Sequence, residues 1–142
     1  MTTPIPIALV EPEEHSARMI QRELLPNFEV VYVLTDPDNA IFQIFTRHMS
    51  KLEGNLDDYR DGFGVGTNPE AAEADRKNPR AIVLTPAVYD EPAAAIKYGM
   101  EHGPIKGVPV VRMVPRLSHQ ASVHELKEQL DGLRKGGAIK AD

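Results

Sequence analysis

Three carboxylates stand directly after the first apolar run of the chain. Residues 5–10 are followed by Glu11, and Glu13 and Glu14 come next across Pro12. Carboxylate oxygens are the ligands that Mg²⁺ prefers, so Glu11 and Glu13 are candidate ligands of a divalent cation. Acids in the first turn of a helix also stabilise the helix dipole without binding any ion. The sequence leaves both interpretations open.

Polar side chains stand at or just beyond the ends of all four apolar runs, at Glu11, Asp36, Thr85 and Arg116. If the runs are parallel strands, their carboxyl ends form the edge where open α/β sheets bind ligands, so we expect these residues to line a ligand site. An ordinary dinucleotide site is not expected, because it needs glycines after the first strand, where this chain has Glu-Pro-Glu-Glu. Asp36, followed by Pro37, also fits a simple helix N-cap.

A glycine-rich segment is the candidate for binding an anion. Gly62, Gly64 and Gly66 lead to Thr67 in a polar stretch that precedes Pro69. Glycines before a helix N-terminus can turn successive backbone N–H groups towards a phosphate. The segment lacks the Gly-Lys-Ser/Thr ending of a P-loop. A surface loop, with or without a partner, is the simpler interpretation.

Tyr89, Asp90 and His119 are candidates for an acid–base set. Tyr89 and Asp90 follow the third apolar run and His119 follows the fourth, so all three would lie near the same sheet edge. No catalytic motif supports them, because the chain has no Gly-x-Ser-x-Gly elbow and no two histidines at the i, i+4 spacing of a metal site. They are therefore candidates by position alone.

Apolar runs alternate with helical patterns along the chain. Strands are predicted at residues 5–10, 28–34, 80–84 and 108–114. Helical patterns cover residues 12–24, 37–52, 69–77 and 90–102, and a capping box at Ser122 and Glu125 opens a last helix that stops at Gly136. This alternation predicts a doubly wound, three-layer α/β/α fold with a mostly parallel four-stranded sheet. Right-handed crossovers favour the strand order 2-1-3-4.

Length and composition indicate one soluble domain. The 142 residues, 42% of them hydrophobic, suit a single α/β domain at 1–137, with an extended loop at 55–68 and a flexible tail at 138–142. A formal net charge of −5 argues against nucleic acid as a partner, and the lack of cysteine excludes disulfides and thiolate chemistry. No segment approaches the roughly 18 apolar residues that cross a membrane, so we expect a cytoplasmic protein.

Parts of the chain resemble the receiver domain of response regulators. The resemblance rests on residues 7–23, 28–40, 80–85 and 108–113, about half of the chain. It implies the flavodoxin-like topology of that family. It also implies a site in which acids after the first strand hold Mg²⁺, an Asp after the third accepts phosphate, a Ser or Thr follows the fourth, and a Lys follows the fifth.

The receiver pattern is broken at its chemical positions. Glu11 matches one acid, but Pro12 stands at the second, Thr85 at the acceptor Asp and Val114 at the Ser or Thr. A fifth strand with its Lys is not evident before the last helix. The resemblance therefore implies a receiver-like shell without aspartyl phosphorylation.

We accordingly expect a non-catalytic regulatory or protein-interaction module. An uncovered apolar edge strand favours pairing with another chain, so we expect a homodimer through residues 108–114, or another protein at that edge. The alternative is a small-molecule, nucleotide or phosphate-binding protein, or a small enzyme, with its site at the strand ends. These two functions make opposite predictions for the loss of Glu11 or Thr85, because only a ligand site needs those side chains.

Overall fold

The computed structural model describes residues 4–45, 79–103, 105 and 107–139. Its elements are β1 (Ile5–Val10), α1 (Glu14–Leu24), β2 (Phe28–Leu34), the 3-10 helix η1 (Pro37–Asn39), β3 (Ile82–Leu84), α4 (Asp90–His102), β4 (Val110–Arg112) and α5 (His119–Lys135). Residues 40–45 are also α-helical. The predicted loop at 55–68 and the helix at 69–77 lie outside the described residues. None of the described helices is long and apolar enough to span a bilayer.

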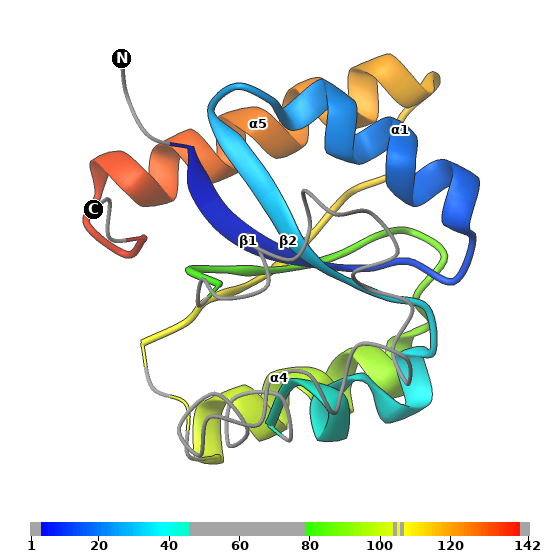
Figure 1. The fold of residues 1–142 in the computed structure, drawn as a ribbon, viewed down its shortest axis with the longest axis vertical. Helices are drawn as coiled ribbons and strands as arrows, with labels where there is room; N and C mark the ends of the chain where they lie inside the picture. The colour runs from blue at the N-terminus through cyan, green and yellow to red at the C-terminus, as the bar shows by residue number, and fades with distance from the viewer. Residues whose placement is uncertain (1–3, 46–78, 104, 106, 140–142) are drawn as a thin grey trace.

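The four strands form one parallel sheet in the order β2-β1-β3-β4. Helices α1 and α5 cover one face, and α4 together with the helical residues 40–45 covers the other (Figure 1). The predicted three-layer α/β/α fold and its strand order are therefore confirmed. The order reverses direction between β1 and β3, and this places the carboxyl ends of these two strands at the switch point of the sheet.

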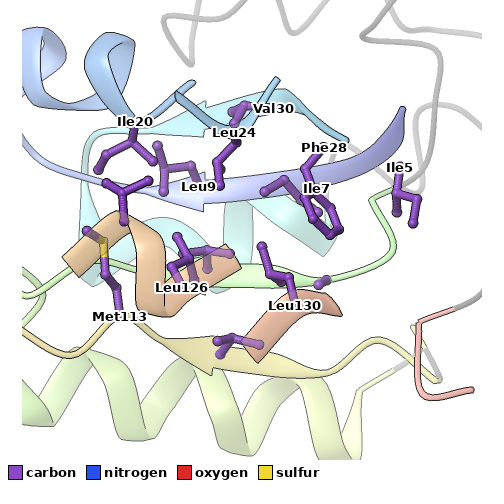
Figure 2. Packing of buried hydrophobic residues seen from close by; sticks show 14 of the residues in the cluster. Ile5, Ile7, Leu9, Ile20, Leu24, Phe28, Val30, Met113, Leu126 and Leu130 are labelled. Atoms are coloured by element: carbon purple, nitrogen blue, oxygen red, sulfur yellow. The ribbon is translucent and has the colours of Figure 1, made fainter. Parts of the chain in front are cut away.

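Strand β1 lies in the centre of the sheet, and all six of its residues are buried. Ile7 and Leu9 point into a core shared with α1 and α5, where they meet residues such as Leu24 and Leu126 (Figure 2). Ala8 and Val10 belong to the second core, under α4. This two-sided burial explains why β1 reads as a continuous apolar run rather than as an alternating one.

A β-bulge in β2 sets the register at the site end of the sheet. Ile7 pairs with Val30, whereas Ala8 pairs with Tyr32, so Val31 is the extra residue on β2. Beyond the bulge the backbone N–H of Glu11 donates to the carbonyl oxygen of Leu34 at 2.9 Å. The backbone of Glu11 is therefore held in place by the neighbouring strand β2.

The N-termini of two helices differ from the prediction. Helix α1 starts at Glu14 rather than at Pro12, with Glu13 as its N-cap. Helix α5 starts at His119, and its N-cap is Ser118, whose hydroxyl accepts from the N–H of Ala121 at 3.1 Å. The predicted capping box at Ser122 is wrong, because the earlier serine already satisfies the first turn and Ser122 lies buried inside the helix.

The last two strands are shorter than their apolar runs. Their hydrogen-bonded ladder covers Ile82–Leu84 and Val110–Arg112, instead of 80–84 and 108–114. The flanking apolar residues Ala81 and Met113 are still buried, because the cores extend beyond the ladder. Burial, rather than strand pairing, therefore accounts for the full length of these runs.

The end of α5 folds back onto the core. Gly137 adopts a φ of 83°, which glycine reaches without strain. The backbone N–H groups of Ala138 and Ile139 both donate to the carbonyl oxygen of Leu133, and Ile139 is only 2% exposed. Ala138 and Ile139, the first two residues of the predicted flexible tail at 138–142, are therefore bonded to the end of α5, and residues 140–142 lie outside the described residues.

We predict that Ile139→Ala lowers the free energy of unfolding by about 2–5 kcal/mol, because it removes a buried aliphatic side chain from the core under α5. The matched control is Leu117→Ala, since Leu117 is fully exposed and its loss should change stability by less than about 0.5 kcal/mol. Urea denaturation measures both. Equal small effects would show that Ile139 is not packed.

Candidate functional site

Glu11 and Thr85 lie side by side at the switch point of the sheet. Glu11 directly follows β1 and Thr85 directly follows β3, and the last residues of these strands, Val10 and Leu84, are paired. The N–H of Thr85 extends the ladder by donating to the carbonyl oxygen of Val10 at 3.3 Å. Parallel pairing therefore brings together two side chains that are 74 residues apart in the sequence.

A short hydrogen bond joins these two buried side chains. The hydroxyl of Thr85 donates to Oε2 of Glu11 at 2.6 Å, and the two residues are 1% and 5% exposed. Burial raises the pKa of Glu11 above its ordinary value, since it disfavours the charged form. The Thr85 bond opposes this rise in the pKa, and the nearby charge of Glu13 adds to it.

An open cavity of about 250 Å³ adjoins the pair. Its walls come from the ends of β1 and β3, from α1, from the segment that joins β4 to α5, and from the first turn of α5. The lining residues include Glu11, Thr85, Ser16, Ile20, Met113 and His119. The cavity lies at the carboxyl edge of the sheet, on the face covered by α1 and α5, which is where the fold predicts a ligand site.

Two basic side chains, Arg116 and His119, line the cavity, and each lies beside a carboxylate. The guanidinium of Arg116 donates through two nitrogens to the carboxylate of Glu125, which lowers the pKa of that carboxyl. Nε2 of His119 lies 3.3 Å from Oε2 of Glu23. Neither Glu23 nor Glu125 belongs to the cavity wall. The charge of Arg116 is thus balanced from outside the cavity, and His119 also lies beside a carboxylate there.

Three of the four residues expected at the strand ends, Glu11, Thr85 and Arg116, line this cavity, and Asp36 does not. Asp36 is the N-cap residue of η1, and its Oδ2 accepts from the side-chain amide of Asn39 at 2.6 Å. Its side chain makes no capping bond to the backbone. Asp36 therefore occupies the expected N-cap position, but its side chain does not cap the helix.

Glu13, the second candidate metal ligand, acts as a cap. Its two oxygens accept from the N–H groups of His15 at 2.9 Å and Ser16 at 2.7 Å, and these bonds lower its pKa. Within the described ranges, no group of three His, Asp or Glu side chains has the spacing to hold a metal ion. The geometry thus gives Glu13 a structural role beside Glu11.

Tyr89, Asp90 and His119 are not gathered into one site. Tyr89 is exposed at the start of α4, and Asp90 accepts from the guanidinium of Arg112 at 2.9 Å. Helix α4 covers the face of the sheet opposite α5, and only His119 lines the cavity. The anion candidates Gly62, Gly64, Gly66 and Thr67 lie outside the described residues.

Three serines at the cavity were not among the predicted site residues: Ser16, Ser118 and Ser122. Ser118 could have been found as an N-cap, because it stands directly before a helical pattern. Nothing in the sequence marks Ser16, which reaches the cavity only because α1 packs beside α5.

Comparison with known protein families, curated proteins and solved structures finds no match to this chain.

We predict that Thr85→Val lowers the free energy of unfolding at neutral pH by about 1–3 kcal/mol, because valine keeps the shape of threonine and leaves the buried carboxyl of Glu11 without its donor. Thr85→Ser is the matched control, since it retains the hydroxyl. Chemical denaturation of the three proteins measures the difference. If the valine variant proved as stable as the parent, the hydrogen bond would carry no stabilising energy.

Proposed function

We propose that this chain is a non-catalytic, receiver-like regulatory module that works by pairing with a second copy of itself. The observation that carries the proposal is the hydrogen bond between Thr85 and Glu11. These two residues stand where a receiver has its phosphate acceptor and one of its metal-binding acids. Here they bind each other inside the protein.

The side-chain chemistry at this position supports a role without phosphoryl transfer. At the position of the acceptor carboxylate of a receiver, this chain has the hydroxyl of Thr85, which donates to the buried carboxylate of Glu11 at 2.6 Å. The neighbouring acid, Glu13, has both oxygens bonded to the first turn of α1. The acids after β1 therefore have structural partners, and we assign the function to a surface of the domain.

The outer edge of β4 supports self-association. The carbonyl oxygen of Pro109 accepts from Ile82, and the N–H of Met113 donates to Leu84, so both groups face β3. Backbone groups of successive strand residues point to alternate sides. The peptide groups of Val110 and Arg112 therefore point outwards, where no strand among the described residues pairs with them.

Two features that can blunt an edge strand, a proline and a charged side chain, are directed away from the outer edge of β4. Proline protects an edge when its missing N–H would have faced outwards, but Pro109 faces β3. The guanidinium of Arg112 is held by Asp90 and by the carbonyl oxygen of Val88, over the start of α4. Antiparallel pairing of two β4 edges about a two-fold axis would extend the sheet across both copies.

We predict that the protein sediments as a dimer and that Val110→Pro converts it to a monomer. The N–H of Val110 points outwards, so proline removes a donor needed for edge pairing without breaking a bond to β3. Analytical ultracentrifugation measures the mass, and circular dichroism checks the fold. Val110→Thr, which retains the N–H, is the control and should remain dimeric. A monomeric parent protein, or a dimer unaffected by proline, would contradict this function.

A further inference from the structure

The charges around the cavity at Glu11 are unbalanced. Arg116 and His119 are the basic side chains of the wall, and each lies beside a carboxylate that is outside the wall. Glu11 is the one acid of the wall, and no cation among the described residues pairs with it. Its only hydrogen bond from those residues is the one from Thr85 to Oε2. The other oxygen, Oε1, remains as an acceptor.

Several other polar groups near the cavity are already bonded, although the buried Nε2 of His119 makes no hydrogen bond with the described residues. The hydroxyl of Ser122 accepts from the N–H of Arg116 at 2.9 Å and donates to the carbonyl oxygen of Ser118 at 3.1 Å. The N–H groups of His15 and Ser16, which could otherwise hold an anion at the start of α1, are bonded to Glu13. A phosphate or carboxylate would thus meet an acid and few available donors.

We propose that this cavity binds a small organic ammonium ion, with its charged nitrogen on the carboxylate of Glu11 and its apolar part against Ile20 and Met113. These two side chains lie together at one end of the core cluster (Figure 2). The cavity, at about 250 Å³, is smaller than a typical pocket for a drug-sized ligand, which selects a ligand of few heavy atoms.

Physical chemistry favours a cation at this position. Burial disfavours the charged form of Glu11 and raises its pKa. An ammonium ion within hydrogen-bond reach would supply the missing opposite charge and keep the carboxylate ionised. A neutral ligand could only donate a weaker hydrogen bond, and an anion would be repelled. The site does not depend on pairing through β4, because no residue of the ladder on that strand lines the cavity.

The test uses three probes with the same carbon chain: n-butylammonium, 1-butanol and butyrate. We expect butylammonium to bind, butanol to bind at least about tenfold more weakly, and butyrate not to bind. Binding is followed through the side-chain methyl signals of the protein in solution by NMR. The signals of Ile20 and Met113 should shift, while those of Ile96 and Met100, buried on the other face of the sheet, should not.

Glu11→Gln should weaken butylammonium binding about tenfold to a hundredfold, because the amide keeps the shape and the acceptor for Thr85 but removes the charge. Glu101→Gln, an exposed acid on α4, removes the same charge elsewhere and should bind like the parent. If butyrate shifts the same methyl signals as butylammonium, or if no probe shifts them, the proposal is wrong. The methyl comparison needs no variant, so it stands even if Glu11→Gln folds poorly. Repeating it on Val110→Pro separates the cavity from self-association.

Discussion

The site depends on how the chain accommodates a buried carboxyl at the end of its central strand. A carboxylate without a hydrogen-bond partner is expensive to bury, and Glu11 is almost fully enclosed. The pairing of β1 with β3 supplies that partner by placing the hydroxyl of Thr85 against it. The same pairing aligns the strand ends that form the cavity. The sheet register, the hydrogen bond and the cavity are therefore consequences of one arrangement.

The strands, their order and part of the site could be predicted because those signals are local. Apolar runs gave the strands, and the right-handed crossover gave the order β2-β1-β3-β4. Glu11 and Thr85 were expected at one edge because each ends a run, but nothing in the sequence indicated that they would bond to each other. The start of α5 was missed because Ser118 and Ser122 both satisfy the capping rule. Ile139 was missed because the preceding glycines signal a helix end, whereas its burial depends on a core cluster built from residues far away in the sequence.

The proposed pairing edge and the proposed ligand cavity both include residues of the short stretch of chain that contains β4 and leads into α5. The outward peptide groups of Val110 and Arg112 belong to the sheet edge, and Met113 belongs to the cavity. Backbone groups of successive strand residues point to alternate sides. The peptide groups of Val110 and Arg112 can therefore pair with another strand while Met113 contacts a ligand.

The most direct measurement is an NMR titration of the side-chain carboxyl carbon of Glu11. We predict that it titrates above the ordinary glutamate range, and that Thr85→Val moves it higher still, because the Thr85 bond lowers the pKa that burial raises. A raised pKa in the folded state also means that the stabilising contribution of Glu11 is present below the ordinary carboxyl pKa and is lost as the pH rises through the raised value. Titration in the ordinary range, unchanged by Thr85→Val, would contradict the account of a buried carboxyl held by threonine.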